Sequence, residues 1–291
     1  MPRLSLKRKI SSGKAHARDL KTRARRVRDP SGSPALFSWP SQPESAGARE
    51  DLSLNDRTGQ DMKKKLLILL LWGGVELSAQ TIVQQFAAIS AGSGTVSDMD
   101  LSQPTDKGSV LIAMPVLLSP GVKVLSVTDN APDGGNTYKQ VSGASSSCAK
   151  KSLDIWYCEN CNPGVTELKF HLSGRVKASI NAFLEVSNMA LSSVVDGSGA
   201  HVSDGTATSG GLEVGPSITT TAKDLIVARY FPTDPLPTGV TPAAWTYTTS
   251  YVYVLNGPSG TYQPTLTGAS AGGSFCMSMA AFKTRTAELP H

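Results

Sequence analysis

Short apolar stretches with a period of two residues recur along the chain. In 165–172, Leu168, Phe170 and Leu172 alternate with polar residues, which is typical of a strand with one buried face. In 179–186 every second residue from Ile180 onward is apolar. Further strands are predicted at 110–117, 122–128, 137–141, 153–158, 224–231, 245–255 and 274–283. No comparably long pattern with helical periodicity is found in this part of the sequence.

Clusters of Gly, Pro, Asn and Asp separate these stretches, at 129–136, 162–164, 196–199 and 256–260. Such residues tolerate positive φ or preset a bend. Many short strands between such turns predict an all-β sandwich or barrel. We expect one domain over 109–284, an N-terminal strand and linker over 80–108, and a tail over 285–291.

A secretory signal peptide is predicted at 62–79. Three lysines follow Met62, an apolar run follows them, and Ala79 supplies a small residue at the cleavage point. A membrane anchor is the alternative, but the run is shorter than the roughly 20 residues that span a bilayer. We therefore expect a mature chain that starts at Gln80. It would be secreted, periplasmic or attached to the cell surface, and would touch the membrane only during export.

The basic charge of the chain belongs to residues 1–61. They hold 13 of the 28 Lys and Arg residues but 7 of the 23 Asp and Glu residues. The basic clusters at 7–9 and 23–28 resemble a nucleic-acid-binding arm, and the alternative is upstream sequence before a mis-assigned start codon. Because export conflicts with such an arm, we expect no nucleic-acid partner. The segment lacks apolar periodicity and is predicted to be a disordered basic leader.

Several strand and turn motifs resemble a group of secreted bacterial proteins. The motifs are a TDxxGNTYxxV hairpin, here 128–141 with residues 131–134 inserted, and the segments IWYCEN at 155–160, EVSN at 185–188 and DLIVA at 224–228. The resemblance covers about 109–282 and implies a jelly-roll-like β-sandwich. Members of the group are mostly uncharacterised, so the resemblance implies little about function.

The four cysteines, Cys148, Cys158, Cys161 and Cys276, are an even number in an exported chain, which points to disulfides. Three connectivities are possible, and we favour Cys158–Cys161 with Cys148–Cys276. A redox CxxC motif would need a helix N-terminus, whereas a strand precedes this pair. A zinc site would need a second close pair of cysteines.

Two groups of residues are candidates for ligand binding. Trp156, Trp245, Tyr251 and Tyr253 could form a sugar-stacking platform, because Tyr251 and Tyr253 share a face opposite two valines; ordinary packing of strand pairs is the alternative. Asp129, Asn130, Asp133 and Asn136 place oxygen atoms in one hairpin, as calcium requires, but the same residues also build tight turns. Calcium is the one cofactor that the sequence suggests.

A catalytic role would rest on Glu185 and Asp154, the two carboxylates that come nearest to the pair that a glycosidase needs. Period two places Glu185 on the face of Phe183 and predicts that this face is wet. We therefore expect a secreted or cell-surface, non-catalytic β-sandwich that binds a glycan or a surface protein. The alternatives are a secreted polysaccharide hydrolase and a structural envelope or appendage subunit.

Overall fold

A computed structural model describes residues 79–91, 94–148, 151–203, 211–231, 236–268 and 275–286. The chain divides into two compact units, Met1–Leu66 and Leu67–His291, and every described residue belongs to the second. The predicted leader and all of the predicted signal peptide except Ala79 lie outside the described residues. In the part that is described, no helix is long and apolar enough to cross a membrane.

The fold is all-β, as the sequence predicts, and every pairing among the described strands is antiparallel. The strands are β1 (Thr81–Ala91), β2 (Val96–Asp100), β3 (Val110–Leu117), β4 (Val124–Asp129), β5 (Lys139–Cys148), β6 (Lys151–Cys158), β7 (Glu167–Leu172), β8 (Ala178–Ser187), β9 (Val195–Ser203), β10 (Leu212–Val214), β11 (Ile218–Thr220), β12 (Asp224–Phe231), β13 (Gly239–Thr241), β14 (Thr246–Tyr247), β15 (Tyr251–Gly257), β16 (Gly260–Tyr262), β17 (Thr265–Thr267) and β18 (Phe275–Lys283), with one 3-10 turn, η1 (Pro132–Gly134).

Strands β1 to β8 form two facing sheets. One has the order β1-β8-β3-β6-β5 and the other the order β2-β7-β4. The pairs β1/β8, β2/β7 and β3/β6 are nested, so the first half of the segment folds back along the second half. The segment 80–108, expected to be partly linker, contains β1 and β2 and is therefore part of the fold.

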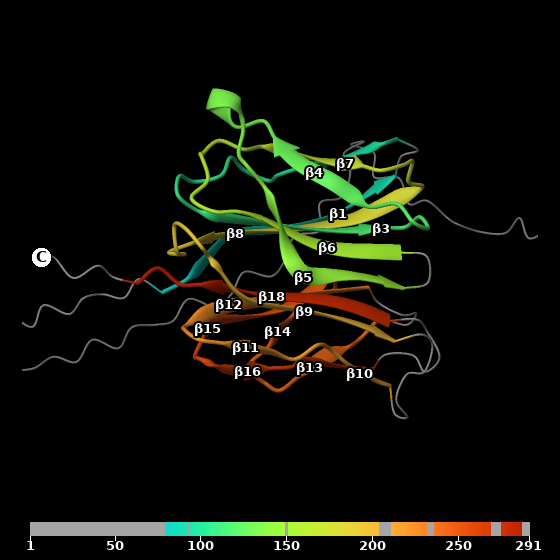
Figure 1. Ribbon diagram of the computed structural model, residues 1–291, viewed down its shortest axis with the longest axis vertical. Helices are drawn as coiled ribbons and strands as arrows, with labels where there is room; N and C mark the ends of the chain where they lie inside the picture. The colour runs from blue at the N-terminus through green and yellow to red at the C-terminus, as the bar shows by residue number, and fades with distance from the viewer. Residues whose placement is uncertain are drawn as a thin grey trace, which may run out of the picture. The chain divides into compact units, whose positions relative to one another are not determined.

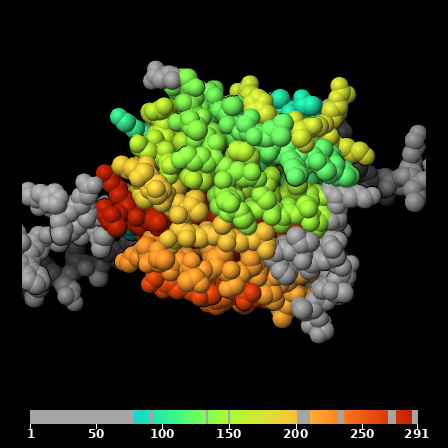
Figure 2. Space-filling model, in the orientation of Figure 1, coloured from blue at the N-terminus to red at the C-terminus, as the bar shows by residue number. Residues whose placement is uncertain are grey.

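Strands β9 to β18 form a second set of sheets. Their main sheet has the order β14-β15-β12-β18-β9, and the small sheets β10-β17-β13 and β11-β16 lie beyond it. Figure 1 shows these sheets as successive layers, from β4 and β7 through the two five-stranded sheets to β11, β16, β13 and β10. Figure 2 shows the same division in its colours, with β3 to β7 green and most of β9 to β17 orange.

Three large apolar cores lie between these layers of the described chain, and a small fourth cluster surrounds the Cys148–Cys276 bond. The first packs β2, β4 and β7 on one five-stranded sheet, as with Phe170 against Phe183. The second lies between the two five-stranded sheets and includes Leu184 and Val227. The third covers the other face of the second sheet, around Met279. The stack therefore contains more sheets than the two of a single sandwich.

This layering explains why some strands read as continuous apolar runs. Every residue of β3 is buried, and so are all but the last residue of β12 and of β18. Because both faces of these strands contact another layer, neither face needs polar side chains. By contrast, the polar side of β7 is half-buried, and the strand alternates as the sequence predicts, with Leu168, Phe170 and Leu172 in the first core.

A buried arginine and a disulfide join the two five-stranded sheets. Arg229 of β12 is 1 % exposed and donates to the carbonyls of Met114, Ile180 and Ser250. The bond Cys148–Cys276 connects β5 to β18. Both links cross between the sheets, so they oppose separation of the two sets of strands.

Candidate functional site

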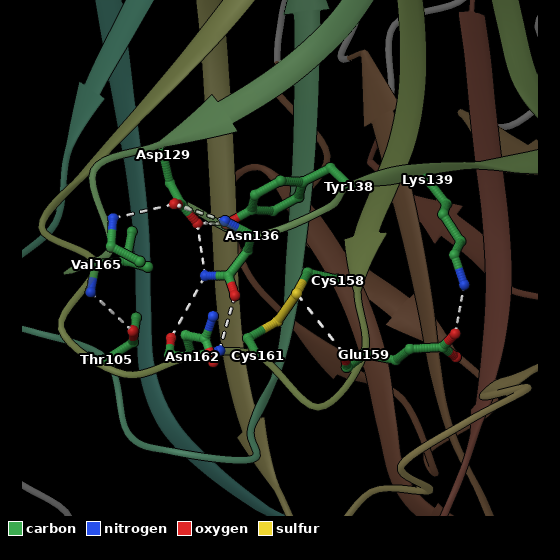
Figure 3. The surroundings of a disulfide bond; sticks show 11 residues. Thr105, Asp129, Asn136, Tyr138, Lys139, Cys158, Glu159, Cys161, Asn162 and Val165 are labelled. Atoms are coloured by element: carbon green, nitrogen blue, oxygen red, sulfur yellow. Dashed lines mark hydrogen bonds and ion pairs between the residues drawn. A yellow bond between two sulfur atoms is a disulfide. The ribbon is translucent and has the colours of Figure 1, made fainter. Parts of the chain in front are cut away.

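The cysteine pairing is the one favoured from the sequence. Cys148 bonds to Cys276 and Cys158 to Cys161, and Cys158 and Cys161 are 3 % and 1 % exposed. The second bond closes the turn after β6 (Figure 3). Paired backbone bonds, Cys161 N to Ser109 O and Gly108 N to Cys161 O, anchor this turn. Both cysteines of this CxxC pair are buried, and the bond between them holds the loop in place.

Asp129 organises the hairpin beside that loop. Its Oδ1 accepts the backbone N–H groups of Ala131 and Asn136, at 3.1 Å each, and its Oδ2 accepts Asn136 Nδ2 at 2.8 Å and Tyr138 Oη at 2.9 Å (Figure 3). Burial, together with the charge and hydrogen bond of Asp129, raises the pKa of the Tyr138 phenol well above its usual value. Both carboxylate oxygens are therefore occupied by donors from the hairpin itself.

The predicted calcium ligands serve as turn residues in this structure. Asn136 Oδ1 accepts the N–H of Asn162 at 2.7 Å, and Asn130 Oδ1 accepts those of Thr166 and Glu167. Nothing is described of the Asp133 side chain. Over the described ranges, no group of three or more His, Cys, Asp or Glu residues could hold a metal ion. The oxygens of Asp129, Asn130 and Asn136 face N–H and O–H donors, so they hold the hairpin together and tie it to the chain that follows the Cys158–Cys161 loop.

The predicted aromatic platform does not form. Trp156 and Trp245 are 7 % and 6 % exposed and belong to different cores, the first and the third. Tyr251 and Tyr253 do share a face, but that face packs on the second core, and Tyr251 Oη donates to Gln85 Oε1 at 2.6 Å. The sequence pattern gave the correct alternation, yet the valines between these tyrosines are buried too, because β15 lies between two layers.

The two candidate acids are also buried. Glu185 shares the side of Phe183, as predicted, but it is 0 % exposed, so the prediction of a wet face is wrong. Gln84 Nε2 donates to its Oε2 at 2.8 Å, and the backbone N–H of Asp106 donates to its Oε1 at 2.6 Å. Asp154 is 6 % exposed and accepts Gln140 Nε2 at 2.9 Å. Burial raises the pKa of the Asp154 carboxyl, against the hydrogen bonds of Ser145 and Gln140.

Glu185 fixes the loop between β2 and β3 to the sheet. Gln84, which binds Glu185, also donates from Nε2 to Gln103 O at 3.0 Å and accepts Ser102 Oγ at its Oε1 at 3.0 Å. These bonds connect β8, β1 and the loop, and the two side chains at their centre, Glu185 and Gln84, are buried. Glu185 therefore has a positioning role in the fold, and its oxygens face this loop.

A pocket of about 420 Å³ lies where four distant segments meet. It is lined by Ala79, Ala222, Lys223, Asn256, Thr284, Arg285 and Thr286. These residues come from the start of the described chain, the approach to β12, the end of β15 and the chain after β18. Lys223 and Arg285 place two positive charges around it. We call this place the terminal seam.

Gln80 anchors the chain at the terminal seam and is 3 % exposed. Its backbone N–H donates to Asn256 Oδ1 at 3.0 Å, and its Oε1 accepts the backbone N–H of Asn256 at 2.9 Å. Its Nε2 donates to Thr284 Oγ1 at 2.7 Å. Asn256 has a φ of 52°, in the left-handed region that Asn tolerates better than most residues. This backbone conformation places its N–H and side chain toward Gln80.

Two carboxyl groups meet next to the seam. Asp224 is 0 % exposed, and burial, reinforced by the neighbouring Asp196, raises its pKa to about 7. Asp196 accepts the N–H and Oγ1 of Thr221 and lies 3.5 Å from Lys283 Nζ. These donors lower the pKa of Asp196 despite its burial. The two carboxyl groups thus share one proton near neutral pH. Because Asp224 is buried, a substrate cannot reach the pair.

The sequence alone did not predict that Gln80 and Asp224 lie close together. A partial signal was present, because Gln80 follows the predicted cleavage point and Asp224 opens a strand in which Arg229 is the one other charged residue. Their proximity depends on pairings across more than a hundred residues, which periodicity does not report. Comparisons of the chain with protein-family models, curated proteins and solved structures find no match. The structure itself defines the class: an all-β protein of stacked antiparallel sheets with two disulfides.

Proposed function

We propose that the chain is exported and acts outside the cytoplasm as a non-catalytic, disulfide-stabilised β-sandwich module that binds another surface. The observation that carries this proposal is the Cys148–Cys276 bond, which joins two large sheets across 128 positions of sequence. Such bonds persist in oxidising compartments and are rare in the cytosol. The signal-peptide pattern at 62–79 gives an independent argument for the same compartment.

The finer architecture that we propose is a jelly roll over β1 to β8. Its support is the nested pairing β1/β8, β2/β7 and β3/β6. A jelly roll is built of eight strands in two facing sheets. Strands β9 to β18 would then form an additional set of sheets that packs against it. This arrangement agrees with what the resemblance to secreted jelly-roll-like proteins implies.

For the partner we favour a protein surface over a glycan. The four aromatic residues that could stack on sugars are buried or half-buried. In contrast, Leu212 and Val214 of β10 are 40 % and 37 % exposed. Leu212 and Val214 flank the buried Glu213, so both point outward from the outermost layer. Grouped exposed apolar side chains are characteristic of protein contacts.

The compartment can be tested on protein produced from the full chain in a bacterial secretion host. We expect it in the medium or periplasm, with no thiol that reacts with iodoacetamide before reduction and four that react afterwards. Cytosolic protein with freely reacting thiols would contradict export.

The binding role can be tested by pelleting the purified protein with envelopes of the producing cells. We expect Leu212→Ser with Val214→Ser to reduce the bound fraction at least several-fold, whereas Ile89→Ser, which changes a more exposed residue on β1, leaves it unchanged. Equal loss in both variants would contradict a specific surface. Turnover of chromogenic glycosides that Glu185→Gln abolishes would overturn the non-catalytic assignment in favour of the hydrolase.

A further inference from the structure

Asn256 forms hydrogen bonds with two atoms of Gln80, its backbone nitrogen and its side-chain oxygen. Gln80 is the residue that would become the N-terminus on export. The backbone N of Gln80 donates to Asn256 Oδ1 and the side-chain Oε1 accepts Asn256 N–H, at 3.0 and 2.9 Å. These two Asn256 atoms belong to one short residue and lie close together. The Gln80 side chain must therefore fold back toward its own backbone nitrogen.

We propose that Gln80 closes into pyroglutamate after export and that Asn256 is the receptor for the resulting lactam ring. This inference rests on the proposed export, because the ring needs a free α-amine at residue 80. A lactam has an N–H next to a C=O on one edge of the ring. The Oδ1 acceptor and N–H donor of Asn256 match that edge in both roles.

The reaction needs no co-reactant. The neutral α-amine of Gln80 attacks its own Cδ, an N–Cδ bond forms, and the Cδ–Nε2 bond breaks. The leaving nitrogen takes the proton that the amine gives up and departs as ammonia. A side chain folded back on its own amine brings the reacting atoms together, which is the effect that makes intramolecular reactions fast.

The surroundings favour the neutral ring over a free N-terminus. Gln80 is 3 % exposed, and a buried ammonium group costs free energy unless it is paired. The terminal seam already carries the cations Lys223 and Arg285, which disfavour a third positive charge. Cyclisation removes that charge and keeps both bonds to Asn256.

The contacts that would be lost are replaceable. Thr284 Oγ1 would lose the Nε2 donor but keeps its own bond to Lys223 O at 2.6 Å. Asn188 Nδ2, which donates to Ala79 O at 2.8 Å, is exposed at this contact and can bind water after cleavage. Ala79 itself lines the pocket, so its removal widens the pocket rather than uncovering a core.

The test is the intact mass and N-terminal peptide of protein secreted from the full chain. We expect a mature chain that starts at residue 80, weighs one ammonia less than the unmodified sequence, and resists Edman degradation. Pyroglutamyl aminopeptidase applied to the unfolded chain should release the block and leave Thr81 first. A chain that starts at Gln80 with a free amine, and keeps it on prolonged incubation at 37 °C, would refute the lactam and leave export standing. A secreted chain that starts elsewhere would refute the lactam and leave export standing, whereas uncleaved protein retained in the cytosol would refute both.

The role of Asn256 has its own readout. Gln80→Ala cannot cyclise, and we expect it to lower the thermal midpoint by about 2–4 °C, the shift typical of about 1 kcal/mol in a domain of this size. An Asn256→Gly background keeps the left-handed φ and the backbone N–H that donates to the ring carbonyl, but it removes Oδ1. In that background the effect of Gln80→Ala on the thermal midpoint should become smaller without vanishing, because one of the two bonds to the ring remains. An unchanged effect in that background would contradict recognition of the ring by Asn256.

Discussion

The proton held by Asp196 and Asp224 should make the stability of the protein fall as the pH rises. Asp224 is 0 % exposed, and neither of its carboxylate oxygens receives a hydrogen bond from a donor group of the described protein. Its neighbour is another carboxyl group, so the two can bond to each other only when they share a proton. Burial and this neighbour raise the pKa of Asp224 to about 7 from 3.8, against the weaker effect of Lys283.

The direction follows from proton binding in the two states. Between about pH 4 and pH 7 the native protein holds the proton on Asp224, whereas the unfolded chain has released it. The contribution to stability is therefore fully present below pH 3.8 and is lost as the pH rises through 7. One unit of pKa corresponds to about 1.4 kcal/mol, which sets an upper limit of about 4 kcal/mol. Because Lys283 and Asp196 lie near solvent that screens charges, we expect about 2 kcal/mol.

Asp224→Asn removes the titration and keeps the shape of the side chain. We expect the free energy of unfolding of this variant, measured in urea, to gain about 2 kcal/mol relative to the unmodified protein between pH 4 and pH 8. The matched control is Asp106→Asn, which changes an exposed carboxylate and should leave the difference flat. The reasoning is refuted if the Asp224→Asn difference does not depend on pH, or if it runs in the opposite direction.

Two further predictions concern the links between the five-stranded sheets. Arg229→Ala should lower the free energy of unfolding by roughly 3–5 kcal/mol, because it leaves a cavity and unpaired carbonyls; Arg229→Met, which refills the volume, should lose less, and equal losses would contradict the cavity contribution. Replacing Cys148 and Cys276 by Ala should cost roughly 5 kcal/mol, whereas replacing Cys158 and Cys161 should cost roughly 2 kcal/mol, because the bonds close loops of very different length, with separations of 128 and 3. Chemical denaturation measures both, and the reverse ranking of the disulfides would contradict a loop-entropy origin.

The central strands were predictable because their sequences leave few alternatives. The ranges 110–117 and 224–231 coincide with β3 and β12, and the favoured cysteine pairing is the one observed. Apolar runs bounded by turn residues fix a strand locally. The two strand ranges depend on neighbours in the sequence, so one sequence suffices to find them.

The sequence did not predict the peripheral strands, because they form only through pairing with strands that lie elsewhere in the sequence. The sequence of β9 is VDGSGAHVS, with two glycines and little apolar alternation. It forms a strand because β18 pairs with it over almost its whole length. The three-residue strands β10, β11 and β13 are held in the same way, by partners distant in sequence. Strand propensity therefore fails to predict strands that are stabilised mainly by tertiary contacts.

The errors about the candidate site have one physical cause. Period-two reasoning assigns one face of a strand to the core and the other to water, as in a two-layer sandwich. In this stack, β8 has the first core on one face and the second core on the other. Glu185 was assigned to water on that rule, but its side faces protein, where an ionised group must find donors. Gln84 and the N–H of Asp106 supply them.

The same reasoning separates binding surfaces from internal polar networks in this protein. A polar residue in a strand whose two faces are both apolar, such as Glu185 in β8 or Arg229 in β12, has no route to solvent. Its hydrogen bonds then connect layers, as Arg229 does through three carbonyls. We therefore expect contacts with other molecules at the outermost sheets and at the terminal seam. Leu212 lies on an outermost sheet, and the pocket beside Gln80 lies at the seam. Substitutions at the surface are therefore expected to change binding, and substitutions in the interior are expected to change stability.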